Sequence, residues 1–256
     1  MSATPVTTET DAGVLSIVMN RPDKKNALTH AMYAAMADAL EQAERENSIR
    51  VVLITGGGDA FTAGNDLGDF MSAPPHGEDA PVFRFLRAIS SASKPVVAAV
   101  NGLAVGVGTT MLLHCDLVYA ARSATFTAPF VNLALVPEAA SSLLLPQRIG
   151  HAKAAELFLL GTKLDAAGAE MAGLVSAVFD DAALLAEATS RARALAAKAP
   201  NAVRLTKALM KRQPEPVAAR MAEEARHFGA QLASPEVREA ITAFMQKRVP
   251  DFSSFS

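Results

Sequence analysis

Hydrophobic and polar positions along the first half of the chain predict alternating strands and helices. Apolar runs typical of strands occupy residues 14–19, 51–55, 96–100, 117–119 and 124–127. The runs at 51–55 and 96–100 are apolar on both faces, as in buried parallel strands. After Thr29, a possible helix cap, apolar residues recur with a 3.6-residue period up to Ala43, which predicts a helix. A second, short and buried helix is expected over 109–114.

Strands that recur with helices between them predict an α/β fold with right-handed parallel crossovers. The spacing of the strands is irregular, since 51 to 96 is a long interval and 96 to 117 a short one. Equal βαβ units of a doubly wound sheet would be more regular. The spacing therefore favours a superhelix of ββα turns.

The last quarter of the chain has a different pattern. Helical periodicity is expected over 182–197, 202–211, 217–232 and 236–248, with Pro200, Pro214, Pro216 and Pro235 between these segments. Ser234 followed by Pro235 is a good helix start, because serine caps well and proline suits the first turn. We divide the chain into a core over 1–195 and a helical region over 196–256. Residues 72–81, rich in proline and polar residues, predict an irregular surface loop.

Composition excludes several classes of protein. Of 256 residues, 50% are apolar and 20% charged, and the net charge of -2 is spread along the chain without the basic stripe that nucleic-acid binding needs. The apolar runs are too short for a membrane span, and the polar N-terminus lacks a signal-peptide pattern. A lone cysteine, Cys115, excludes an internal disulfide framework and fits a reducing compartment, so a cytoplasmic location is expected. The five histidines lack ligand spacing, so no metal site is predicted.

The first segment with candidate chemistry is 61–67, which contains Gly64, Asn65 and Asp66 and follows the strand at 51–55. Ligands of open α/β proteins gather at the carboxyl ends of strands, which favours a binding role. A simple loop with an Asx turn is the alternative.

The second segment, 101–110, connects a buried strand to the predicted short helix and carries Gly106 and Gly108. Glycines let the backbone approach a ligand, and a helix start offers free N–H groups that suit a developing negative charge. The alternative is close packing of helix on strand.

The third segment, 135–142, holds one carboxylate, Glu138, among apolar residues at the apparent start of a helix. Apolar surroundings raise the pKa of a carboxyl group, as a general base for carbon acids requires. An exposed first-turn glutamate that complements the helix dipole is the alternative.

Together these segments resemble the enoyl-CoA hydratase/isomerase (crotonase) family over nearly the whole chain. The similar stretches are 20–22 with 26–28, 61–67, 94–102 continuing through 106–108 to 115–116, and 173–175. The resemblance implies a ββα superhelix with a C-terminal helical trimerisation region, assembled as a homotrimer or hexamer. It also implies an acyl-CoA thioester as substrate. No separate cofactor is expected, because coenzyme A is part of the substrate.

By this resemblance, the two amides of an oxyanion hole fall on Asn65 and Val107, the latter a position where many members have glycine. Hydratases of the family use two glutamates, and this chain has Thr110 and Phe130 in their places. Glu138 instead matches the acid of the peroxisomal-type 3-enoyl to 2-enoyl-CoA isomerases. The expected activity is that isomerisation, with Glu138 as single acid and base. The alternatives are a hydratase or other crotonase reaction on an acyl-CoA, and a non-catalytic acyl-CoA-binding subunit.

The same resemblance suggests where the substrate binds. Phe130, Leu133 and Leu135 are expected to line a dry acyl pocket, with simple core packing as the alternative. Candidate cations for the CoA phosphates are Lys24, Lys25, Arg84, Arg87 and Lys247, with an ordinary solvated surface charge as the alternative for each. The substrate-binding set is completed by Ala27, Leu28, Ala63, Gly64, Asp66, Leu67 and Gly106.

Overall fold

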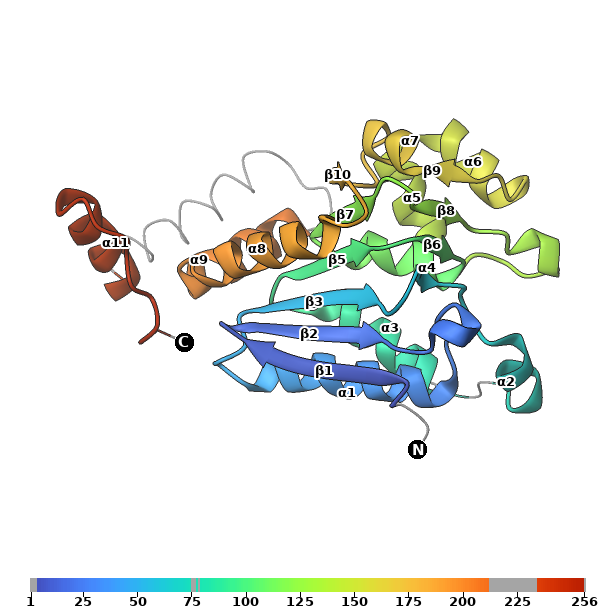
Figure 1. Cartoon of the computed structure of the whole chain (residues 1–256), viewed down its shortest axis with the longest axis horizontal. Helices are drawn as coiled ribbons and strands as arrows, with labels where there is room; N and C mark the ends of the chain where they lie inside the picture. Colours follow the sequence, from blue (N-terminus) through green and yellow to red (C-terminus); the bar gives the residue numbers. More distant parts are fainter. Residues whose placement is uncertain (1–3, 75–76, 78, 212–233, 256) are drawn as a thin grey trace.

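The computed structural model describes residues 4–74, 77, 79–211 and 234–255, and within them the chain forms a six-stranded and a four-stranded sheet (Figure 1). The larger sheet has the order β1-β2-β3-β5-β7-β10, formed by Val6–Asp11, Val14–Met19, Val51–Gly56, Val96–Val100, Leu117–Ala121 and Ala177–Phe179. The smaller has the order β4-β6-β8-β9, formed by Ala60–Thr62, Leu103–Val105, Thr125–Thr127 and Leu164–Asp165.

Strands that follow one another in sequence alternate between the two sheets. β3, β5 and β7 are parallel neighbours in the larger sheet, and β4, β6 and β8, which follow each of them in sequence, are parallel neighbours in the smaller. Each turn of the chain thus adds one strand to each sheet, with helices in the connections. The expected α/β fold, a superhelix of ββα turns, is confirmed.

The core forms where the predicted apolar runs lie. All residues of β3 and β5 are buried, as expected for strands covered on both faces. Helix α1 (His30–Arg45) begins after Thr29, whose Oγ1 accepts the Met32 N–H at 3.3 Å. Its buried face also includes Tyr33, so it is wider than the periodic stripe indicated. Helix α3 (Pro81–Ser91) packs on α1.

Other helices are short and connect the strands. They are η1 (Pro22–Lys24), α2 (Leu67–Ser72), α4 (Val107–Thr110), η2 (Met111–His114), η3 (Val131–Leu133), α5 (Ser141–Ile149), α6 (His151–Leu159) and α7 (Ala166–Met171). The helix predicted at 109–114 is the pair α4 and η2. The described residues between α2 and α3 are irregular, as predicted for 72–81.

Of the C-terminal helices, α8 lies against the larger sheet, whereas α11 lies away from the sheets (Figure 1). α8 (Leu184–Ala196) packs across the larger sheet, α9 (Pro200–Met210) follows, and α11 (Pro235–Met245) lies at the far end. Ser234 Oγ accepts the Val237 N–H at 3.2 Å, so the predicted cap is confirmed. The helix predicted over 217–232 lies outside the described residues, as do Pro75, His76, Glu78, Pro214, Pro216 and His227.

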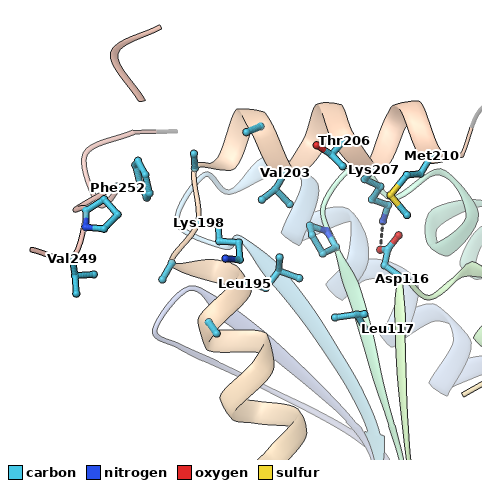
Figure 2. Close-up of a pocket in the computed structure, with 16 residues that line it drawn as sticks. Asp116, Leu117, Leu195, Lys198, Val203, Thr206, Lys207, Met210, Val249 and Phe252 are labelled. Carbon is cyan, nitrogen blue, oxygen red and sulfur yellow. Dashed lines mark hydrogen bonds and ion pairs between the residues drawn. The ribbon is translucent and has the colours of Figure 1, made fainter. Parts of the chain in front are cut away.

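One ion pair fastens α9 to the core. Lys207 Nζ donates to Asp116 Oδ2 at 2.7 Å and to the Lys94 carbonyl at 2.6 Å, and Asp116 Oδ2 also accepts the Val96 N–H (Figure 2). Beside this pair lies a groove of about 780 Å³, formed by α8, α9 and residues 249–252. In the described ranges, no helix is long and apolar enough to cross a bilayer.

Candidate active site

The first candidate donor is the main-chain N–H of Asn65. Asn65 forms an isolated parallel bridge with Leu28, in which the Leu28 N–H donates to Gly64 O at 2.7 Å and the Asp66 N–H donates to Leu28 O at 2.8 Å. In a parallel bridge of this kind, Leu28 bonds to the carbonyl of Gly64 and the N–H of Asp66, the residues on either side of Asn65. The N–H of Asn65 itself therefore points away from Leu28. Within the described residues, it meets no acceptor.

The second candidate donor is the N–H of Val107, the first residue of α4. First-turn N–H groups have no partner inside their own helix. The preceding Gly106 donates its N–H to Thr127 O at 2.9 Å, while the N–H groups of Thr109 and Thr110 both reach Gly106 O. The side chain of Val107 is buried, so only its main-chain donor is offered to the site.

Gly64 allows these two segments to touch. Its φ is +87°, and a Cβ there would lie 2.8 Å from the carbonyl oxygen of Val105. A side chain at this position would push apart the segments that carry Asn65 and Val107. The fold thus sets two unpaired main-chain donors in adjoining segments, the arrangement that stabilises a developing oxyanion.

Glu138 lies in the loop before α5 and not at a helix start, which corrects the sequence interpretation. α5 begins only at Ser141, whose N–H and hydroxyl both donate to the Glu138 carbonyl, at 3.0 and 2.6 Å. The two intervening alanines, Ala139 and Ala140, have φ of 56° and 53°, which delays the helix. The alternative of an exposed first-turn glutamate is therefore wrong.

The carboxyl of Glu138 accepts a hydrogen bond from the hydroxyl of Thr110, the last residue of α4. Burial raises the pKa of Glu138, and the Thr110 hydrogen bond opposes that rise in part. Because Thr110 and Val107 belong to the same four-residue helix, the acid and one main-chain donor are held by one element.

A hollow is lined by the two residues that follow Glu138 in the chain, but not by Glu138 itself. A cavity of about 610 Å³ reaches Ala139 and Ala140, and its wall includes Phe83 and Leu86 of α3 and the ring of His114. His114 Nε2 lies 2.9 Å from the Ala139 carbonyl, and burial lowers the pKa of His114, so the ring is neutral at pH 7. The three side chains expected in the acyl pocket differ in exposure. Phe130 is buried against Phe158, while Leu133 and Leu135 are about half exposed.

Several predicted CoA-binding residues come together around the turn at 20–28. Arg21 Nη1 donates to Asp66 Oδ2 at 2.7 Å and to Ala27 O at 3.0 Å, and the Ala63 N–H donates to Lys25 O at 2.8 Å. Leu28 is buried beneath this junction. Leu67, the first residue of α2, is half exposed.

The predicted cations are not equivalent. Arg84 is engaged by α1, with contacts of 2.6 Å to Glu41 and 2.7 Å to Asp38, so it is poorly placed as a phosphate ligand. Lys25 pairs with Asp59 at 2.6 Å on the surface. Arg87 lies 3.9 Å from Asp79. Lys24, at the end of η1, and Lys247, beyond α11, are exposed.

Sequence reasoning missed Tyr33. Its hydroxyl donates to Asn65 Oδ1, and its ring is fully buried. A tyrosine on the buried face of a predicted helix was the available signal, because a buried phenol usually finds a polar partner. Among the described residues, no group of acidic, histidine or cysteine side chains could hold a metal ion.

These features define an α/β superhelix protein in which two main-chain donors and a partly buried carboxyl lie on segments joined by direct contacts. The family model described as enoyl-CoA hydratase/isomerase matches residues 9–254. The chain therefore belongs to the enoyl-CoA hydratase/isomerase family and has the crotonase fold.

Individual relatives include both isomerases and hydratases. The chain is 38% identical to human enoyl-CoA delta isomerase 2 over 92% of its own length, and spans 62% of the length of that relative. It is 35% identical to 2,3-dehydroadipyl-CoA hydratase from Escherichia coli K12, with 93% of this chain and 94% of the relative covered. A solved enoyl-CoA hydratase/isomerase from Pseudoalteromonas atlantica T6c superposes with a TM-score of 0.80 at 50% identity, with 97% of this chain and 100% of the other covered.

Proposed function

We propose that the protein moves the double bond of a 3-enoyl-CoA to the 2-position, with Glu138 as the single acid and base. The observation that carries the proposal is the partly buried carboxyl of Glu138, hydrogen-bonded to Thr110, whose raised pKa suits proton transfer at carbon. Its neighbour Thr110 and the buried Phe130 stand where the family's hydratases have glutamates, and neither can act as an acid or base. The similarity to enoyl-CoA delta isomerase 2 supports the same reaction.

The reaction balances with one base. The carboxylate of Glu138 takes a proton from C2 of the substrate, and the electrons of that bond move into a dienolate whose charge rests on the thioester oxygen. The N–H groups of Asn65 and Val107 donate to that oxygen. The protonated Glu138 then returns the proton to C4, which leaves the 2-enoyl product and regenerates the base. Removing one oxyanion donor typically costs a factor of about 10²–10³ in rate.

Substitution of Glu138 by glutamine tests the assignment. Glutamine keeps the size of the side chain and its acceptor for Thr110 but cannot take a proton. We expect E138Q to lower kcat for 3-enoyl-CoA by roughly 10²–10⁴, the usual contribution of a general base. The assay follows formation of the conjugated enoyl chromophore. E170Q, at an exposed glutamate of α7, is the matched control and should match wild type. An E138Q enzyme of nearly normal activity would discard the assignment.

Hydration of a 2-enoyl-CoA is the second candidate, favoured by the similarity to 2,3-dehydroadipyl-CoA hydratase. The same spectrometer separates the two reactions, because addition of water removes the enoyl chromophore and isomerisation creates it. Since hydration needs a second group to hold and activate water, we expect it to be roughly 10²-fold or more slower than isomerisation. Hydration that equals isomerisation in rate would favour the second candidate. Binding of CoA esters without turnover of either substrate would indicate a non-catalytic subunit.

A further inference from the structure

Tyr33 is a buried polar side chain that the proposed reaction does not use. It lies on α1 with its ring enclosed by Phe70 and Phe85, at centroid distances of 6.0 and 5.6 Å, and no part of it is exposed. Its hydroxyl crosses from α1 to the segment after β4, where it donates to Asn65 Oδ1. Helix α1, which packs on α3 and on the larger sheet, thus also reaches a residue of the candidate active site.

We infer that Tyr33 is a positioning residue for the isomerisation, because its phenol holds the Asn65 side chain and thereby aims the main-chain N–H of Asn65 at the thioester oxygen. The inference rests on the proposed function. It adds to that function a residue that does not touch the substrate. It also explains why residue 65 carries a side-chain amide although its expected donor is the backbone.

The backbone around Asn65 is already held along one edge. Leu28 holds one edge of the segment through the bridge to Gly64 and Asp66, and Thr62 Oγ1 accepts the Gly64 N–H at 3.1 Å. The peptide between Gly64 and Asn65 carries the N–H in question, and Gly64 is the residue with the greatest backbone freedom. The carbonyl of that peptide is held by the Leu28 N–H, and the Tyr33 hydrogen bond, by fixing the Asn65 side chain, adds a second restraint on its rotation.

The phenol remains a donor throughout the working pH range. Burial raises the pKa of Tyr33 well above the usual value, and the negative charge of Glu138 raises it further. Tyr33 is therefore near enough to the base to sense its charge, yet does not ionise while the base does. A positioning role predicts a loss of rate that is the same at every pH, whereas a role in proton transfer would change the pH profile.

The first test is Y33F, which removes only the hydroxyl. We expect kcat for 3-enoyl-CoA to fall about tenfold to a hundredfold, the scale expected for misplacing a catalytic group by about 1 Å, with KM changed less than about threefold. The drop should be constant between about pH 6 and 9. The chain has one other tyrosine, Tyr119, buried on β7 against Phe179, and Y119F is the matched control that should keep wild-type kcat. Wild-type kcat in Y33F, or a pH-dependent loss, would overturn the inference.

A double-mutant cycle then locates the action of Tyr33. N65A keeps the main-chain N–H but removes the side chain that Tyr33 holds. If Tyr33 acts through that side chain, N65A alone should lower kcat to a similar level, and Y33F/N65A should lie within about twofold of the slower single variant. Losses that multiply in the double variant would show that Tyr33 acts elsewhere. Should Y33F fail to fold, N65A decides alone, and wild-type kcat in N65A would overturn the inference.

The design separates this inference from the proposed function. A wild-type protein that does not isomerise 3-enoyl-CoA would contradict the proposed function. Exchange of the C2 protons of a saturated acyl-CoA in D₂O would then replace the assay, because it needs the same enolate stabilisation without a shift of the double bond. If Y33F exchanged the C2 protons at the wild-type rate, as the control Y119F should, this assay would also overturn the role of Tyr33.

Discussion

At the scale of single residues, the site depends on how one hydroxyl adjusts one carboxyl. Burial raises the pKa of Glu138, and the hydrogen bond from Thr110 lowers it. In the proposed reaction, the first effect makes the carboxylate a stronger base toward a carbon acid, and the second favours its ionised form. Thr110 is fully buried, so no solvent can replace its hydroxyl.

Removal of that hydroxyl should move the acid limb of the pH profile. A base works only when deprotonated, so kcat/KM falls as the pH falls through the pKa of Glu138. T110V deletes the group that lowers this pKa, so we expect the limb to shift to higher pH, with kcat/KM at pH 7 reduced roughly twofold to tenfold. The measurement is kcat/KM for 3-enoyl-CoA against pH.

Two neighbours control the experiment on Thr110. T110S retains a hydroxyl and should restore the position of the limb. T109V removes the adjacent buried hydroxyl, which donates to Ala104 O and Thr127 O and not to Glu138, so it should leave the limb in place. A limb that stays fixed in T110V, or moves equally in T109V, would show that Thr110 does not adjust the base.

The contacts of Tyr33 with Asn65 and of Thr110 with Glu138 could not be predicted from the sequence. Glycine spacing and the single acid pointed to the segments of Asn65, Val107 and Glu138, because those signals are local. Which side chains contact these segments depends on long-range pairing, and Asn65 lies 32 residues from Tyr33 in sequence. A helical period shows that Tyr33 is near a buried face but not what its hydroxyl meets.

At the scale of elements, long apolar runs, capped helices, the short strand β8 and the short helix pair α4 and η2 were predicted well, while β1, β4 and β6 were not. β3, β5 and α1 agree with the pattern within a residue or two. β1 was missed because all its residues after Val6 are exposed and polar, as an antiparallel edge strand permits. β4 and β6 have three residues each, too few for a period to show. The start of α5 was misplaced because left-handed alanines have no sequence signal.

The contact between the segments after β4 and after β6 gives the clearest element-scale prediction. G64A adds one methyl group that must displace the Val105 carbonyl, at a φ where alanine is strained. We expect kcat to fall by about 10² or more, since both oxyanion donors are displaced, and the melting temperature to fall as well. Kinetics with 3-enoyl-CoA and thermal unfolding are the measurements.

A substitution at Gly150 is the control that separates the effect of backbone strain from the effect of displacing the Val105 carbonyl. Its φ is +81°, yet a Cβ there meets nothing within 4 Å, so G150A imposes a similar backbone strain without the close contact. G150A should lower the melting temperature while kcat stays near wild type. Equal kcat in G64A and wild type would show that the two segments need not touch for the reaction.

At the scale of the whole molecule, the C-terminal helices leave apolar surface uncovered. Met210 on α9, Ile241 and Met245 on α11 and Val249 beyond it are between 53% and 84% exposed. The groove of about 780 Å³ adds Leu117, Leu195 and Val203 to this surface (Figure 2). Met210 and Val249 line the groove itself, and an exposed apolar groove of this kind marks an interaction site in a stable protein.

Assembly of identical chains over this surface is the outcome we predict, in line with the trimer or hexamer that the family resemblance implies. Size-exclusion chromatography with light scattering should give three or six times the chain mass of 26.8 kDa. M210K combined with V249K would place charges in the covered surface, and we expect the mass to fall toward one chain, because an unpaired buried charge costs several kcal/mol. M171K, at an 89% exposed methionine of α7, should leave the mass unchanged. A wild-type protein that elutes as a single chain at about 100 μM, well above the Kd range of stable assemblies, would contradict the prediction.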